Sequence, residues 1–206
     1  MKLFLTSSVH AVAHDITKKA NLSKAKKLVF IDTAAEIEEG DKTWLKNDRQ
    51  ALMDAGFEVD DYSITGKSRN QLEIDLEKFD YIYLSGGNTS YLLQESQKSG
   101  FISLVKKLVQ EKEKIYIGTS AGSIIAGPKI PEYLVDDNPK LEDTNAYNLV
   151  NFTVLPHWGS EGFRELYLGK RLKIAYKKDQ IPILLLTDNQ YVYVQNDQST
   201  IIDVKK

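Results

Sequence analysis

The side chains best suited to covalent chemistry lie in a short glycine-rich segment near the middle of the sequence. An apolar run, Ile115–Ile117, leads into residues 118–122 (GTSAG), and a helix-compatible segment follows. A Gly-x-Ser-x-Gly motif between a strand and a helix is typical of a nucleophile elbow, a sharp turn that lifts the serine above the sheet. We therefore predict that Ser120 is a nucleophile. The N–H of Ala121, at the helix N-terminus, is then placed to stabilise developing negative charge. An ordinary turn between a strand and a helix is the alternative.

A serine nucleophile needs a base, and the sequence contains three histidines. His157 follows a predicted strand, Phe152–Leu155, and therefore lies at the carboxyl edge of the sheet, where ligands bind in open α/β folds. His10 and His14 lie in a looser polar stretch after the first predicted strand, where a structural hydrogen bond is the simpler explanation. We predict that His157 is the base. We expect no metal site, because cysteine is absent and the His10–His14 spacing shows weak helical periodicity.

The base in turn needs an acceptor that holds its tautomer and stabilises the imidazolium. Asp188 directly follows the apolar strand Ile183–Thr187, again at a strand end, and comes after Ser120 and His157 in the chain. We predict that Asp188 is this acceptor. A turn-forming aspartate is an equally good explanation of the spacing. The polar segment that precedes His157 offers three rival acceptors: Glu132, Asp136 and Asp137.

A second glycine turn, residues 85–89 (SGGNT), follows the predicted strand Tyr81–Leu84. Glycine lets the backbone approach a substrate closely, so the N–H of Gly87 is a candidate second oxyanion donor. The same turn could hold a phosphate. It lacks the spacing of dinucleotide-binding and P-loop motifs, so we expect no nucleotide cofactor.

Composition narrows the chemistry further. The chain has 206 residues, 27 Lys+Arg, 29 Asp+Glu, a formal net charge of -2 and no Cys. Disulfides, thiolate metal sites and cysteine nucleophiles are thereby excluded, and the balanced charge favours neither nucleic acid nor membrane as a partner. The first residues make a poor signal peptide, and no apolar run approaches the ~20 residues of a membrane span. We expect a cytoplasmic protein.

Short β-rich runs alternate with amphipathic stretches, which predicts an α/β fold with a mostly parallel sheet. The strands are predicted at Leu3–Thr6, Leu28–Asp32, Glu58–Ile64, Tyr81–Leu84, Ile115–Ile117, Phe152–Leu155 and Ile183–Thr187, and a closing hairpin spans residues 191–204. Helices are predicted from a cap at Asp41 or Thr43 to Gly56, from a cap at Thr89 or Ser90 to Gly100, and over Phe101–Glu113. Pro128–Asn151 is polar and predicts a surface excursion beside the site. Residues 1–206 are expected to form a single domain.

Four motifs in this order resemble the peptidase E (aspartyl dipeptidase) family of serine peptidases. They are residues 85–89 (SGGNT), 118–123 (GTSAGS), 155–157 (LPH) and 186–188 (LTD), and the likeness covers most of the chain. The resemblance implies a three-layer, flavodoxin-like sandwich similar to class I glutamine amidotransferase domains. It also implies hydrolysis of short peptides with N-terminal aspartate by a Ser-His-Glu triad, without a metal or another cofactor.

Residue by residue, the resemblance assigns Ser120 as nucleophile, His157 as base, and Gly87 and Ala121 as oxyanion-hole donors. Asp188 stands where the family has glutamate, so the acceptor here is one methylene shorter.

The family's aspartate preference is tied to an arginine downstream of the catalytic histidine, and Arg171 lies at the matching distance. The planar guanidinium suits a substrate carboxylate because it donates two parallel hydrogen bonds. Arg171 lies in an amphipathic stretch, Phe163–Tyr176, where a solvated basic face is also expected, and Arg164 is a rival.

Two other functions are compatible with the same residues. One is a related acyl hydrolase, such as a cyanophycinase-like isoaspartyl peptidase or a small esterase, with a different pocket. The other is a non-enzymatic ligand-binding module in which Gly86 and Gly87 hold an anion and Ser120 is a turn residue. The expected partner is a small peptide substrate, and the sequence carries no prediction of oligomeric state.

Overall fold

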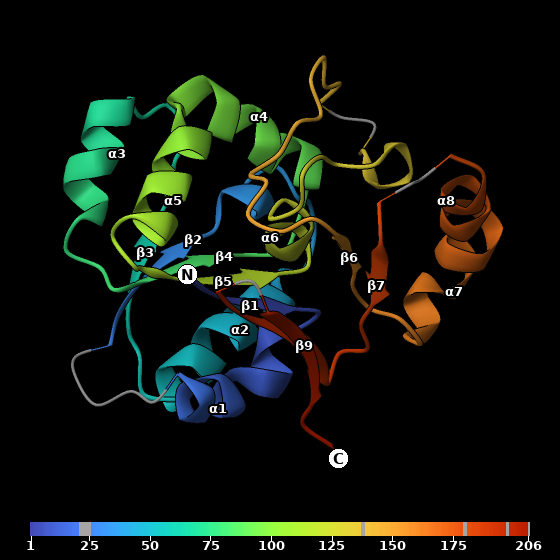
Figure 1. Ribbon diagram of the computed structural model, residues 1–206, viewed down its shortest axis with the longest axis horizontal. Helices are drawn as coiled ribbons and strands as arrows, with labels where there is room; N and C mark the ends of the chain where they lie inside the picture. The colour runs from blue at the N-terminus through green and yellow to red at the C-terminus, as the bar shows by residue number, and fades with distance from the viewer. Residues whose placement is uncertain (21–25, 137–138, 179–180, 197, 206) are drawn as a thin grey trace.

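A seven-stranded sheet with helices on both faces forms the centre of the molecule (Figure 1). The computed structural model describes residues 1–20, 26–136, 139–178, 181–196 and 198–205. The strand order is β3-β2-β4-β5-β1-β8-β9, and β6 and β7 form a separate two-stranded sheet. The strands are β1 (Lys2–Thr6), β2 (Lys27–Ile31), β3 (Glu58–Tyr62), β4 (Tyr81–Leu84), β5 (Ile115–Thr119), β6 (Thr153–Leu155), β7 (Ile183–Leu185), β8 (Gln190–Gln195) and β9 (Gln198–Asp203).

Five neighbouring strands, β3, β2, β4, β5 and β1, run parallel, and the hairpin β8–β9 adds two antiparallel strands beside β1. The apolar run that predicted β4 is buried at every position, as expected for a strand covered on both faces. β3, with the sequence EVDDY, lies at the sheet edge and leaves its acidic side chains exposed. The predicted three-layer α/β sandwich with a mostly parallel sheet is confirmed.

Each face of the sheet has its own buried apolar cluster. α1 (Val9–Lys19) and α2 (Thr43–Asp54) cover one face, and α3 (Arg69–Leu76), α4 (Thr89–Ser99), α5 (Phe101–Gln110) and the short α6 (Ala121–Ile124) cover the other (Figure 1). Within the described residues, no helix has the length and apolar character needed to cross a membrane.

The predicted helix ends are mostly confirmed. α2 stops just before Gly56, and α4 ends at Gly100, whose φ of 72° is the left-handed conformation that glycine favours. Asp41, a predicted cap of α2, accepts the N–H of the first helical residue at 2.9 Å, whereas the cap of α4 is displaced by one or two residues. Lys42 precedes α2, while Asn88 caps α4 by accepting the Tyr91 N–H, because an amide oxygen reaches that donor as well as a hydroxyl does.

The description of the His10–His14 stretch as loose is wrong. Both residues lie on α1, whose buried face is formed by Val9, Val12, Ala13 and Ile16. These positions have the i, i+3, i+4, i+7 spacing of an amphipathic helix, and packing against the sheet stabilises it.

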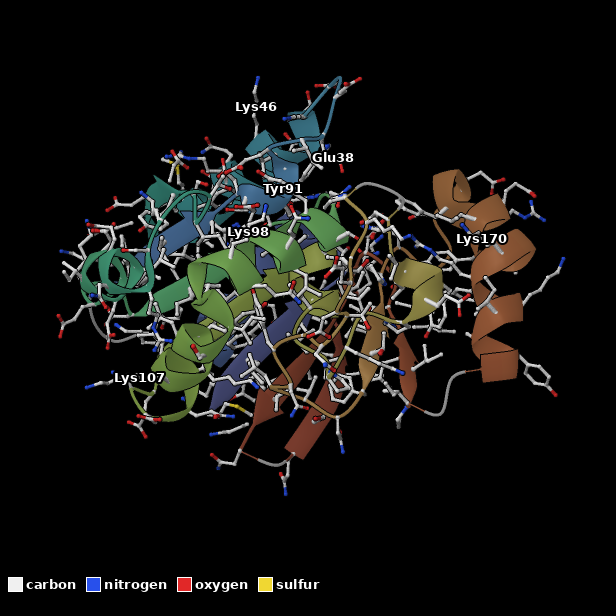
Figure 2. The ribbon with its side chains drawn as sticks, turned by 90° about the horizontal axis from the view of Figure 1, so that it is seen from above. Glu38, Lys46, Tyr91, Lys98, Lys107 and Lys170 are labelled. Atoms are coloured by element: carbon white, nitrogen blue, oxygen red, sulfur yellow. The ribbon has the colours of Figure 1, made fainter. Side chains whose placement is uncertain are left out.

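The small sheet is a further departure from expectation. β6 and β7 pair with each other in parallel, from Thr153↔Ile183 to Leu155↔Leu185, and stand beside the main sheet rather than in it. Beyond them lies a helical arm: η3 (Glu161–Phe163), α7 (Arg164–Leu166), the π-helical η4 (Tyr167–Arg171) and α8 (Leu172–Lys178). Figure 2 shows this arm, which carries Lys170, at one end of the molecule.

The segment from Pro128 to Asn151 is more than a polar surface excursion. Ile130, Tyr147 and Leu149 are buried in the apolar cluster that the β6–β7 sheet shares. These buried residues are separated by many polar ones, so the segment as a whole has a polar composition. This composition is why the sequence predicted a surface excursion.

Candidate active site

Ser120 stands at the turn between β5 and α6. Its φ of 49° and ψ of -107° form a combination that costs a non-glycine residue on the order of 1–3 kcal/mol. Surrounding hydrogen bonds hold the turn: the Ser120 N–H donates to the Thr6 carbonyl at 3.1 Å, and the Ser120 carbonyl accepts from Ser123 and Ile124 at 2.9 Å. This strained strand-to-helix turn is the conformation that a nucleophile elbow requires.

The two glycines of the motif are explained by close backbone contacts. A Cβ on Gly118 would clash with the Gly122 carbonyl, and a Cβ on Gly122 would clash with the carbonyl of Leu84 on β4. The buried hydroxyl of Tyr116 donates to the Gly122 carbonyl at 2.6 Å. Glycine at both positions therefore lets α6 start directly against the sheet.

The β6–β7 sheet positions the predicted base and acceptor. Because the two strands run in parallel and end together at Leu155 and Leu185, the chain beyond each one leaves at the same edge. His157 follows β6 with a φ of 60°, and Asp188 follows β7. Two segments 31 residues apart in sequence thus bring an imidazole and a carboxylate together.

The structure brings the three predicted side chains into one hydrogen-bonded chain. His157 Nδ1 lies 2.8 Å from Asp188 Oδ1, and His157 Nε2 lies 3.1 Å from Ser120 Oγ. A carboxylate accepts only, so the proton is on Nδ1 and Nε2 is free to accept the Ser120 hydroxyl proton. This is the tautomer in which the imidazole can act as a general base toward Ser120.

Two further serines, which the sequence analysis did not identify, surround the carboxylate. Ser7 Oγ donates to Asp188 Oδ1 at 2.7 Å and accepts the His157 N–H at 2.7 Å, while Ser160 Oγ donates to Asp188 Oδ2 at 2.8 Å. Hydrogen bonding to His157, Ser7 and Ser160 holds the pKa of the Asp188 carboxyl well below its usual range, although partial burial opposes this shift. The position of Ser7 after β1, at the same strand edge as Ser120, was the available signal.

Aromatic stacking fixes the His157 ring. Phe163 of η3 lies parallel to it, with the ring centroids 4.6 Å apart and an interplanar angle of 21°. The imidazole is therefore held on its edge by hydrogen bonds and on its face by a phenyl ring.

Gly87 and Ala121 offer backbone N–H groups beside Ser120. Gly87 has a φ of 122°, and a Cβ there would clash with the Ala34 carbonyl, so glycine is required. The position where Gly86 would carry a Cβ is 3.3 Å from Ser120 Cβ, which places this turn against the serine. In the part of the chain that the structure describes, neither the Gly87 nor the Ala121 N–H has an acceptor.

A pocket of about 480 Å³ opens over these groups. Arg171 lines it together with Ser120, His157 and Asp188. The guanidinium lies 5.1 Å from the centroid of the Tyr167 ring, and its Nη1 donates to Tyr167 Oη at 3.2 Å. Arg164, the rival, is exposed, pairs with Glu161 at 3.5 Å and does not line this pocket.

The rival acceptors take other positions. Asp136 lines the pocket, but its carboxylate accepts the Ser90 N–H at 3.2 Å, and Glu132 is exposed on η2 (Glu132–Leu134). Asp137 lies outside the described residues. Within the described ranges, no three His, Cys, Asp or Glu side chains gather closely enough to hold a metal ion.

Comparison with known proteins bears directly on this site. The model of peptidase family S51 matches residues 3–202. The chain belongs to peptidase family S51. As an S51 member it is a peptidase of the serine type, and the predicted resemblance to the peptidase E family is confirmed.

Relatives of this S51 peptidase carry the same kind of name. An uncharacterised peptidase of Pasteurella multocida is 33% identical over 204 residues, which is 97% of this chain and 96% of the relative. An uncharacterised peptidase of Listeria monocytogenes is 35% identical over 185 residues, 88% of this chain and 89% of the relative. A Drosophila melanogaster protein named for alpha-aspartyl dipeptidase activity is 27% identical over 194 residues, 91% of this chain and 76% of the relative.

Solved structures share the fold of this S51 peptidase. A crystal structure of a protein assigned as peptidase E from Listeria monocytogenes has a TM-score of 0.87 and 29% identity, and covers 98% of each chain. A peptidase from an acI-B1 Actinobacterium has a TM-score of 0.71 at 16% identity, covers 98% of this chain and 87% of that chain, and supports the fold alone.

Proposed function

We propose that this S51 peptidase hydrolyses short peptides, namely dipeptides, with N-terminal aspartate, using Ser120, His157 and Asp188 as its catalytic triad. The supporting observation is the continuous hydrogen-bonded chain from Ser120 Oγ through His157 to Asp188 at the floor of the pocket. Each member also comes from a segment whose local conformation holds it in place.

In the first half of the reaction, Ser120 Oγ attacks the carbonyl carbon of the first residue while His157 Nε2 takes the hydroxyl proton. Asp188 stabilises the imidazolium that forms. The tetrahedral intermediate then collapses, the C–N bond breaks, and His157 gives its proton to the leaving amine. The product is an acyl-enzyme ester on Ser120.

In the second half, His157 takes a proton from water, and the resulting hydroxide attacks the ester carbonyl. Collapse of this intermediate breaks the bond to Ser120 Oγ, which recovers the proton from His157. In both halves the negative oxygen is stabilised by the N–H groups of Gly87 and Ala121. Neither N–H donates to an acceptor in the described part of the chain, so both are available to the substrate. One such donor contributes roughly 3 kcal/mol of transition-state stabilisation in serine peptidases.

Arg171 supports the aspartate preference. Its Nε is buried and has no hydrogen-bond partner among the described residues, while Tyr167 holds the rest of the guanidinium in the pocket wall. Because Arg171 lines the pocket, its guanidinium can donate charge-assisted hydrogen bonds to a substrate carboxylate bound there. The name of the Drosophila relative agrees with this substrate class.

Replacing the nucleophile tests the reaction. We expect Ser120→Ala to reduce turnover of Asp-Leu by roughly four orders of magnitude or more, since loss of a triad serine removes covalent catalysis. Circular dichroism checks that the fold is kept, and a fluorophosphonate probe should label wild type but not the variant. Retained turnover, or an unlabelled wild type that binds phosphate tightly, would contradict the proposal.

The substrate assignment is tested in the same assay. Arg171→Gln should lower kcat/KM for Asp-Leu by at least roughly tenfold and leave the slow hydrolysis of Ala-Leu unchanged, because only aspartate presents a side-chain carboxylate. Arg164→Gln is the matched control. Equal rates for Asp-Leu, Asn-Leu and Ala-Leu on wild type would reject the aspartate specificity and keep the peptidase.

A further inference from the structure

A second histidine lines the pocket. His10, at the start of α1, has a side chain that is 49% exposed. Its Nδ1 lies 3.2 Å from Asp48 Oδ1 and 2.8 Å from Ser8 Oγ. Because the carboxylate can only accept, Nδ1 carries a proton. Nε2 has no protein partner in the described part of the chain and is available to a ligand.

Asp48 gives this histidine a fixed position and a charge. The Asp48 side chain is 4% exposed, and its Oδ2 accepts the hydroxyl of the buried Tyr83 at 3.0 Å. A buried carboxylate needs a positive partner, and His10 fills this role. The hydrogen bond to Asp48 raises the pKa of His10, partial burial opposes this shift, and the charges of Asp48 and Asp188 add to it. At a given pH, the imidazolium form of His10 is therefore more populated than that of a free histidine.

The wall that carries His10 adjoins the nucleophile. Trp44 lines the pocket one helical turn before Asp48 on α2. The position where Gly86 would carry a Cβ lies 3.6 Å from Trp44 Cζ3 and 3.3 Å from Ser120 Cβ. Trp44 and Ser120 therefore both lie against Gly86. His10 lies on the same wall as Trp44, because it contacts Asp48 of the same helix.

The two basic side chains that line the pocket come from different parts of the fold. His10 belongs to the α1–α2 layer, whereas Arg171 belongs to the arm beyond β6 and β7, on the side of the other apolar cluster (Figure 1). Ser120 follows β5 and lines the same pocket as both of them. A peptide whose acyl residue binds Arg171 and whose scissile bond lies over Ser120 can therefore extend its leaving residue toward the wall that carries His10 and Trp44.

We propose that His10 binds the C-terminal carboxylate of the leaving amino acid, whose side chain lies against Trp44, and that this contact restricts the enzyme to dipeptides with a free C-terminus. The inference rests on the proposed function, because it takes Arg171 as the partner of the N-terminal aspartate. A longer peptide has an amide in place of this carboxylate and cannot form a charge-assisted hydrogen bond with the imidazolium.

Binding to the inactive Ser120→Ala protein tests this role without turnover. Calorimetry at pH 6.5 compares Asp-Leu with aspartyl-leucinamide, which lacks the C-terminal charge. We expect Asp-Leu to bind at least roughly tenfold more tightly than the amide. Adding His10→Gln should remove this difference by weakening Asp-Leu alone, whereas His14→Gln, an exposed change one turn further along α1, should have no effect.

The outcomes separate the two proposals. Equal binding of the acid and the amide, no binding of either peptide, or an equal loss of both in His10→Gln overturns the role of His10. Absence of Asp-Leu hydrolysis by wild type, together with carboxylate-dependent binding that His10→Gln abolishes, rejects the peptidase specificity and leaves the role of His10 standing.

Discussion

At the scale of single residues, the shorter acceptor at position 188 is the clearest difference from the pattern that the resemblance implies. Asp188 nevertheless reaches His157 at 2.8 Å, and Ser7 and Ser160 complete the hydrogen bonding of its carboxylate. Three donors thus meet two oxygens, an arrangement that holds the carboxylate ionised and correctly oriented. A longer glutamate would have to displace Ser7 or shift His157.

We expect Asp188→Asn to lower kcat for Asp-Leu by roughly 10³–10⁴-fold, because the amide can present N–H to the imidazole and favour the wrong tautomer. KM should change little, since Asp188 faces the imidazole. Ser160→Ala, which removes one donor and leaves the charge, is the matched comparison and should lose far less.

Asp188 also makes stability depend on pH in a definite direction. Its pKa is lower in the folded protein than in the unfolded chain, where aspartate titrates near 3.9. Its stabilising contribution is therefore fully present above about pH 4–5 and is lost as the pH falls toward the folded pKa. The free energy of unfolding of wild type minus that of Asp188→Asn, measured with urea, should decrease from pH 6 to pH 3. A constant difference would contradict this.

At the scale of elements, the elbow depends on two backbone contacts that permit no side chain. Gly118 meets α6, and Gly122 meets β4. The motif was visible in the sequence because glycine is required at both positions. The partners of these contacts were not visible, since Leu84 lies far from Gly122 in the chain.

Gly122→Ala tests this account of the elbow. The added methyl would meet the Leu84 carbonyl, a backbone atom that cannot move away alone. Displacement of Ser120 by about 1 Å costs on the order of 10²-fold in rate, so we expect at least this loss of kcat/KM and a lower melting temperature. Gly162→Ala, where an added Cβ meets nothing within 4 Å, should leave both within experimental error.

At the scale of the whole molecule, the candidate site lies where two sheets meet. The main sheet carries Ser120, and the β6–β7 sheet leads to His157 and Asp188. The buried Leu186 joins the two strands of the small sheet, since its N–H donates to the Leu155 carbonyl and its carbonyl accepts the Trp158 N–H, both at 2.9 Å. Packing at this junction sets the geometry of the triad.

We therefore expect Leu186→Ala to lower the free energy of unfolding by roughly 2–5 kcal/mol, as cavity-forming core substitutions do. It should also lower kcat for Asp-Leu, because His157 and Asp188 flank the cavity. Ile74→Ala on α3 is the control, since its side chain is 70% exposed. A stable variant with reduced activity would mean that Leu186 positions the site without stabilising the fold.

Much of this architecture could be predicted from local patterns. Apolar runs located β2 and β4, and glycine marked the ends of α2 and α4. The separate β6–β7 sheet could not be predicted, because the apolar pattern of a strand does not determine which other strand it pairs with. The position of Ser7 after β1 was a signal in the sequence, but the hydrogen bonds from Ser7 and Ser160 to Asp188 could not be predicted, because they join residues far apart in the chain.

Ser7 Oγ and Asp188 Oδ1 are 181 positions apart in the chain and bonded in the fold. The elbow at Ser120 is built from β5, α6 and a hydrogen bond to the Thr6 carbonyl, and none of these involves Asp188. A partly folded chain can therefore hold the nucleophile while the imidazole still lacks the carboxylate that orients it. The proposed catalytic activity would thus arise only when β1 and the segment that follows β7 have come together, so it reports completion of the fold.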